Sequence, residues 1–208
     1  MGNLVVSQFI TLDGVFQDPG GTGELDRGGW SFKGDRGEQG MKFKLDEIRA
    51  AGALLLGRVT YEGFAQAWPS MPRDEVGYAD KMNSMPKYVI SATLEQAEWN
   101  NSTVLRGEVA QEVRTLKRQI DGDILINGSG QLVEALLEHD LIDEFRLTMC
   151  PIVLGSGKRL FPGAGNEISL RLVDTVKSGD SLILTYQPVR VPAQGSSEPA
   201  PAGEQVDQ

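Results

Sequence analysis

The chain has 208 residues, of which 40% are hydrophobic and 24% charged, a composition typical of a globular protein with one large domain or two small ones. Its net charge of −9 argues against nucleic acid or an anionic membrane as a partner, because both bind basic surfaces. No apolar run approaches the roughly 20 residues that a membrane span needs. The single cysteine, Cys150, excludes an internal disulfide and fits a cytoplasmic location.

The composition changes near residue 191. From there to residue 208 the chain is rich in Pro, Ala, Gly, Ser, Gln and acidic residues and lacks an apolar period, which predicts a disordered tail. Residues 1–190 contain no repeat and no internal linker, so we expect them to form one domain.

Strand-like and helix-like patterns alternate along residues 1–190. The first strand is followed by a loop over residues 13–35 that holds seven glycines, and loops of this length are usually functional or mobile. Apolar or alternating patterns predict strands over residues 4–11, 53–56, 88–91, 124–127 and 143–150. Amphipathic patterns predict helices over residues 38–51, 60–67, 74–84, 109–120 and 132–137.

A hairpin is predicted at the end of the domain. Two strand patterns, 169–176 and 182–187, flank the sequence Lys-Ser-Gly-Asp, which is a turn signal. Together with the alternation upstream, this predicts an α/β fold: a mostly parallel sheet, helices on both faces and an antiparallel C-terminal edge.

The most informative segment is the turn after the second predicted strand. An apolar run stops at Gly57, Arg58 and Thr60 follow at once, and a helix pattern then begins. The N-terminus of a helix binds anions, because free backbone N–H groups and the positive end of the helix dipole point outward there. The segment therefore indicates a site for a phosphate-bearing cofactor, and the alternative for Arg58 is a surface salt bridge.

A second turn has the same design. Asn127 ends an apolar strand, Gly128-Ser129-Gly130 follows, and an amphipathic helix begins. Such turns are also common as purely structural connections between a strand and a helix. However, both turns lie at the carboxyl end of a strand, where α/β sheets bind ligands. A third glycine-containing segment, Gly155-Ser-Gly-Lys-Arg159, does not match the P-loop pattern. It indicates a bend after a strand, which brings the cations Lys158 and Arg159 near the site or an interface.

These motifs resemble the dihydrofolate reductase fold. The closer likeness is to the reductase domain of bacterial riboflavin biosynthesis and to small stand-alone relatives, and it runs from about residue 3 to 188. The segments that carry it are LVVSQFITLDGV at 4–15, GRVTYEGF at 57–64, PKYVIS at 86–91, NGSGQLV at 127–133 and PIVLGSGKRLF at 151–161.

The resemblance implies NADPH as the cofactor. By this likeness Arg58 and Thr60 meet the cofactor phosphates, and Ser91 lies near the adenosine 2′-phosphate unless it is a simple turn hydroxyl. The resemblance also implies that Gly128, Ser129 and Leu132 line the pyrophosphate. Gly57 and Gly130, in the same two turns, are further candidates for cofactor binding.

Hydride comes from the nicotinamide, but a substrate nitrogen can still need a proton. Asp13 is the first candidate for the acid that donates this proton. Asp13 and Gly14 are also candidates for substrate binding, and the alternative is that they only form an Asp-Gly turn. Asp35 is the second candidate, because it lies five residues after Trp30, a spacing that resembles the tryptophan–acid pair of dihydrofolate reductase. Trp30 either contacts the substrate near the nicotinamide or anchors the core.

The sequence thus predicts an NADPH-dependent reductase of a pterin-like or aminopyrimidine-like ring, with a homodimer as its expected assembly and no metal. The alternative is a non-catalytic nucleotide-binding or sensor protein that has kept the cofactor pocket.

Overall fold

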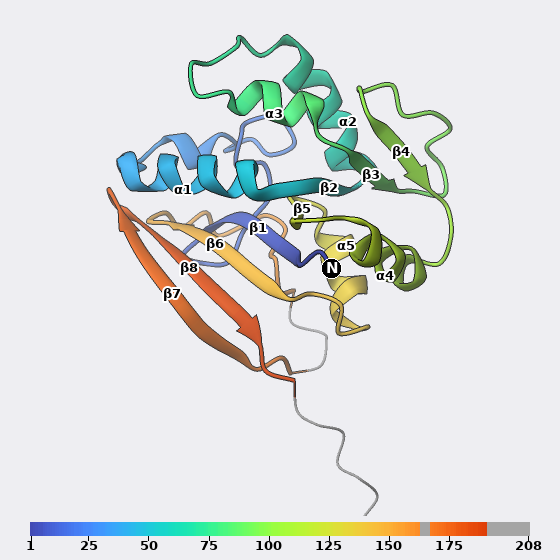
Figure 1. Ribbon diagram of the computed structural model, residues 1–208. Helices are drawn as coiled ribbons and strands as arrows, with labels where there is room; N and C mark the ends of the chain where they lie inside the picture. Colours follow the sequence, from blue (N-terminus) through green and yellow to red (C-terminus); the bar gives the residue numbers. More distant parts are fainter. Residues whose placement is uncertain (163–166, 191–208) are drawn as a thin grey trace, which may run out of the picture.

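The computed structural model describes residues 1–162 and 167–190, and the predicted tail at 191–208 lies outside these ranges (Figure 1). Within them every helix is too short or too polar to span a bilayer. One sheet of eight strands runs through the described residues. Its strands are β1 (Leu4–Thr11), β2 (Ala51–Gly57), β3 (Lys87–Ile90), β4 (Ser102–Leu105), β5 (Asp123–Ile126), β6 (Glu144–Cys150), β7 (Leu170–Ser178) and β8 (Ser181–Pro188).

The strand order is β4-β3-β2-β5-β1-β6-β8-β7. Strands β1 to β6 run parallel, whereas β8 pairs antiparallel with both β6 and β7. The two-residue turn Gly179-Asp180 joins β7 to β8, and Gly179 has a φ of 55°, which favours glycine. The predicted parallel sheet with an antiparallel C-terminal hairpin is confirmed.

Helices cover both faces of the sheet. They are α1 (Gly37–Ala50), α2 (Arg58–Ala67), α3 (Tyr78–Ser84), α4 (Val109–Gln119) and α5 (Gly130–Leu137), with short 3₁₀ turns η1 (Trp30–Phe32) and η2 (Trp68–Ser70). Figure 1 shows α1, α2 and α3 on one face and α4 and α5 on the other.

Each face has its own apolar core. Leu54, Leu56 and Val5 pack with side chains of α1, α2 and α3, and residues of β1, β5 and β6 pack with α4 and α5 on the opposite face. Both layers are therefore anchored on the same central strands.

Three details differ from the sequence-based expectations. Strand β4 was not predicted, because its four residues are only partly buried or exposed and are too few to show an apolar pattern. Helix α3 begins at Tyr78 rather than near residue 74, because Gly77 adopts a left-handed φ of 77° and the Asp74 carboxylate accepts the N–H groups of Tyr78 and Ala79. Helix α2 begins directly at Arg58, with no linker after the strand.

Lys87 is the one lysine among the largest fully buried side chains, and no solvent reaches it. Its ammonium group donates to the carbonyls of Asn83 and Met85 at 2.9 and 2.8 Å and lies 4.3 Å from the centre of a Trp99 ring. Burial lowers the pKa of Lys87 to about 8. This lysine joins the start of β3 to the C-terminal end of α3.

We expect Lys87 to make stability depend on pH. The unfolded chain, with an ordinary lysine pKa, binds more protons than the folded chain between pH 8 and about 10.5, so the free energy of unfolding rises with pH in that window. Relative to Lys87→Met, wild-type protein should gain about 2 kcal/mol between pH 7.5 and 9.5 in urea unfolding. Parallel pH profiles for the two proteins would contradict the lowered pKa.

Candidate functional site

The two predicted glycine turns lie next to each other at a switch in topology. Strands β2 and β5 are neighbours and parallel, so both end at the same edge of the sheet. Helix α2 leaves β2 on one face, whereas α5 leaves β5 on the other. In open α/β sheets, the point where successive helices diverge in this way forms the ligand-binding crevice.

Two hydroxyl groups join the turns. The Gly57 N–H donates to Ser129 Oγ at 2.8 Å, and the Ser129 N–H donates to Thr60 Oγ1 at 3.0 Å. The hydroxyls of Ser129 and Thr60 are also 3.0 Å apart. The structure thus brings together segments about 70 residues apart in the chain, and we call this contact the turn clamp.

Glycine is required at position 128 for two reasons. Its φ is 62°, and an added Cβ would lie 2.7 Å from Thr60 Oγ1. Gly130 is also confined, because a Cβ there would lie 2.5 Å from the Phe16 ring. The two glycines therefore allow the turn to pack directly against Thr60 and Phe16.

The other predicted cofactor residues have different surroundings. Arg58, with 44% of its side chain exposed, pairs with Glu62 at 2.9 Å on the surface of α2. Ser91 Oγ accepts the N–H groups of Thr93 and Leu94, so this hydroxyl closes a turn after β3. Leu132 is buried in the core beneath α5.

Asp13 anchors a loop. Its carboxylate accepts the Thr11 hydroxyl at 2.7 Å and the N–H groups of Leu154 and Gly155 at 3.2 and 2.8 Å. The hydrogen bond from Thr11, followed by those from the backbone, lowers the pKa of Asp13 to about 2. Arg159 reinforces the anchor by donating to the Asp13 carbonyl at 2.9 Å. The bend at 155–159 therefore folds back onto the end of β1, and at neutral pH the Asp13 carboxylate carries no proton to donate.

The second acid and the tryptophan have different surroundings. Asp35 is exposed, and its side chain accepts the Gly37 N–H at 2.8 Å, at the start of α1. Trp30 is almost fully buried, and its indole N–H donates to the Gln17 carbonyl at 2.8 Å. Trp30 therefore anchors the 13–35 loop from below.

A buried aspartate organises the same loop. The Asp18 carboxylate accepts hydrogen bonds from Thr22, Gly23 and Leu25, which lower its pKa against the opposing effect of burial. This loop is therefore built around its own polar centre and is ordered within the domain.

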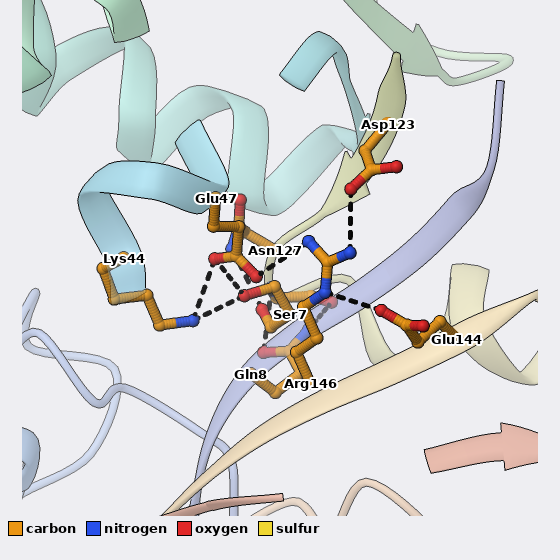
Figure 2. A network of polar contacts seen from close by, with 9 residues as sticks. Ser7, Gln8, Lys44, Glu47, Asp123, Asn127, Glu144 and Arg146 are labelled. Carbon is orange, nitrogen blue, oxygen red and sulfur yellow. Dashed lines mark hydrogen bonds and ion pairs between the residues drawn. The ribbon is translucent and has the colours of Figure 1, made fainter. Parts of the chain in front are cut away.

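Sequence reasoning missed a polar network beneath α1, which Figure 2 shows. Lys44 donates to Ser7 Oγ at 2.6 Å and to Glu47 at 3.1 Å, and the Ser7 hydroxyl donates to Glu47 at 2.8 Å. On β6, Arg146 lies 3.6 Å from the other Glu47 oxygen.

Arg146 connects this cluster to two further carboxylates. It donates to Asp123 at 2.8 Å and to Glu144 at 2.7 Å. Burial opposes the charge of Arg146, but its hydrogen bond to Glu144 and the negative charges of Asp123 and Glu47 raise its pKa overall.

The network reaches the second glycine turn through β1. The Asn127 side chain donates to the Ser7 carbonyl at 2.9 Å, and the Gln8 side chain exchanges two hydrogen bonds with the Gly128 backbone. The sequence holds one hint of this: Ser7 and Gln8 interrupt an otherwise apolar strand, and both are buried.

These features define an α/β domain with a reductase-like fold. Over residues 3–184 the chain matches the family model described as the RibD C-terminal domain, and it therefore belongs to that family. Two uncharacterized Bacillus subtilis (strain 168) proteins are similar to it. YyaP is 30% identical over 83% of this chain and 87% of its own length, and YwjB is 31% identical over 85% and 92%.

Solved structures share the fold. A Shewanella sp. PV-4 protein provisionally assigned to riboflavin biosynthesis has a TM-score of 0.71 at 23% identity, over 90% of this chain and 99% of its own. RibD of Acinetobacter baumannii gives 0.63 at 16% identity, over 91% of this chain and 59% of its own. Dihydrofolate reductase of Enterococcus faecalis, complexed with NADP(H), gives 0.51 at 17% identity, over 90% and 96%.

The turn clamp can be tested through stability. Thr60→Val keeps the shape of the side chain but removes the acceptor of the Ser129 N–H, so the free energy of unfolding should fall by about 1–2 kcal/mol. Thr60→Ser keeps the hydroxyl and should cost clearly less. Urea unfolding of the two variants measures the difference, and equal losses would show that the hydroxyl does not hold the turns together.

Proposed function

We propose that residues 1–190 form an NADPH-dependent reductase of a pterin-like or aminopyrimidine-like heterocycle. The reaction would resemble that of 5-amino-6-(5-phosphoribosylamino)uracil reductase or of dihydrofolate reductase. The observation that carries the proposal is the turn clamp, which sets two helix N-termini side by side at the topological switch between β2 and β5.

The residues at the switch fit a dinucleotide. Gly57, Gly128 and Ser129 would lie beside the pyrophosphate. The first N–H groups of α2, which have no partner within the helix, would face it. Arg58 would leave Glu62 for a cofactor phosphate, an exchange that is favourable because a phosphate carries more charge. Ser91 follows β3, one strand beyond β2, where the adenosine end would lie. When bound, NADPH would supply the hydride.

The substrate would then lie toward β1 and β6. Neighbouring strands are about 4.8 Å apart, so β6 lies about 10 Å from β5 along the same edge. Gly14 and Trp30 belong to the loop above this part of the edge, and Asp13 fixes that loop from its base. We propose a positioning role for Asp13, because its hydrogen bonds keep it ionised.

The cofactor site is tested by two matched variants. Arg58→Ala removes the guanidinium, whereas Glu62→Ala breaks the same ion pair but leaves the guanidinium free. We expect Arg58→Ala to weaken NADPH binding about 10- to 100-fold, the value of a charge-assisted hydrogen bond, and Glu62→Ala to leave it equal or tighter. Tryptophan fluorescence quenching measures both, and equal affinities for NADPH in all three proteins would refute the assignment.

A non-catalytic NADP(H)-binding or sensor protein is the second candidate. It is favoured by one observation: of the two predicted proton donors, Asp13 is held as an anion and Asp35 is exposed beside the hairpin. The two functions separate in a turnover assay. If NADPH binds but is never oxidised with a panel of pterins, aminopyrimidines, flavins and quinones, the reductase proposal fails and the sensor proposal stands.

We also propose a homodimer formed through β7. This strand lies at the sheet edge, and Leu172 and Val173 are each about half exposed there. Unpaired edges with apolar side chains invite pairing with another chain. A location in a reducing cytoplasm would suit the one buried thiol, Cys150.

A charge on β7 should dissociate the dimer. We expect wild-type protein to elute as a dimer at 50 μM in size-exclusion chromatography with light scattering, and Leu172→Lys to shift toward the monomer. Val76→Lys, at a similarly exposed residue in the loop before α3, is the control and should remain dimeric. A monomeric wild type would refute the dimer.

A further inference from the structure

A small cavity lies beneath the segment that leads into α1. Its volume is about 190 Å³, and it is open to one side between that segment, the end of β6 and the start of β8. Four nearly fully buried residues form part of its wall: Trp30, Ser31, Cys150 and Ser181. Burial raises the pKa of the Cys150 thiol, so this wall is uncharged at neutral pH.

Two cations, Lys33 and Arg36, also line the cavity. The Arg36 guanidinium lies 5.0 Å from the centre of the Phe9 ring and 5.1 Å from that of Phe32. Within residues 1–162 and 167–190, its nitrogens form no ion pair and no hydrogen bond. By contrast, Arg58 and Arg146 each pair with a carboxylate.

The surroundings hold Arg36 in place. The Ser178 hydroxyl donates to the Arg36 carbonyl at 2.6 Å. Gly37 follows, and a Cβ there would lie 2.5 Å from the Gly179 nitrogen, so the backbone is packed directly against the β7–β8 turn. The neighbouring carboxylate of Asp35 accepts the Gly37 N–H instead of pairing with Arg36. The backbone at Arg36 is therefore held in place, and the guanidinium lies near two rings while its five N–H donors lack an acceptor among the described residues.

We propose that this cavity binds a planar anion of about one ring in size, with its negative group on Arg36. A planar guanidinium matches a carboxylate or phosphate through paired hydrogen bonds, and Pro151 and Ile152 in the cavity lining offer an apolar surface to the rest of the ligand. A cavity of about 150 Å³ holds benzene, so 190 Å³ accommodates one substituted ring, whereas a fused pair of rings would extend into solvent.

This inference rests on the proposed function in one respect, the assignment of the cavity to the substrate. The cavity lies at the β6 end of the edge that carries the turn clamp, on the side where a nicotinamide would lie. With this assignment, Arg36 would select substrates that carry an acidic group, and the size of the cavity would favour substrates with one ring over those with two fused rings.

The probes are benzoate and its neutral analogue benzamide, titrated into the ¹⁵N-labelled full chain. The indole N–H signal of Trp30, identified by its absence in Trp30→Phe, reports binding in the cavity. We expect benzoate to bind at least fivefold more tightly than benzamide. Arg36→Met should remove that preference, and Arg36→Lys should keep part of it.

The control is Arg49→Met, on the same helix, where the guanidinium donates to the Val76 carbonyl at 2.9 Å and should not affect benzoate. The proposal is overturned if neither probe shifts the Trp30 signal at 50 mM, if both bind equally, or if Arg36→Met keeps the preference. Should Arg36→Met fail to fold, the wild-type preference and Arg36→Lys still decide the question.

NADPH binding to the same proteins separates this inference from the reductase proposal. Arg36→Met should bind NADPH normally, and Arg58→Ala should bind benzoate normally. A wild-type protein that prefers benzoate but does not bind NADPH would end the reductase proposal and leave the anion site standing. A wild-type protein that binds NADPH but shows no preference for benzoate would refute the anion-site proposal and leave the reductase proposal standing.

Discussion

The hydrogen bonds between Thr60 and Ser129 are the contact on which the candidate site depends. They join the first turn of α2 to the turn before α5, although these helices lie on opposite faces of the sheet. Without this contact, two separate glycine turns would each be ordinary connections between strand and helix. With it, the first turn of α2 and the turn before α5 are held next to each other at one edge of the sheet.

The buried network supports this arrangement from within the sheet. Asn127 and Gly128 are bonded to Ser7 and Gln8, and Ser7 is in turn bonded to Lys44 on α1. Buried charges are costly unless they are paired, which is why the carboxylates and cations beneath α1 alternate in one connected group. The same group that attaches α1 to β1 and β6 therefore also fixes the position of the second turn.

Much of the fold could be predicted because its signals are local. The apolar run of β1, the glycines after β2 and β5, and the turn residues before β8 each lie within a few positions of the element they define. The strand at 102–105 has no such signal, because it has only four residues, none of them fully buried, and it is defined by its pairing with β3.

The candidate site was less predictable, for a different reason. Ser7 meets Glu47 across 40 residues, and Thr60 meets Ser129 across 69. No spacing along the chain encodes such contacts, and polar residues inside a buried pattern give only a hint. The role of Asp13 had the same difficulty, since its acceptor groups are occupied by a loop more than 140 residues away.

The charged side chains at the carboxyl edge of the parallel strands differ in whether they have partners within the protein. The chain is acidic overall, yet the Asp13 carboxylate is occupied by hydrogen bonds from Thr11, Leu154 and Gly155, and the Asp18 carboxylate by hydrogen bonds from its own loop. Arg36 keeps its donors without a protein acceptor among the described residues, and the Glu62 partner of Arg58 is exposed and exchangeable. Two carboxylates near this edge therefore order loops, whereas Lys33 and Arg36 line a cavity there. If the proposed function holds, a cofactor phosphate would lie beside α2 and an acidic group of the substrate beside α1.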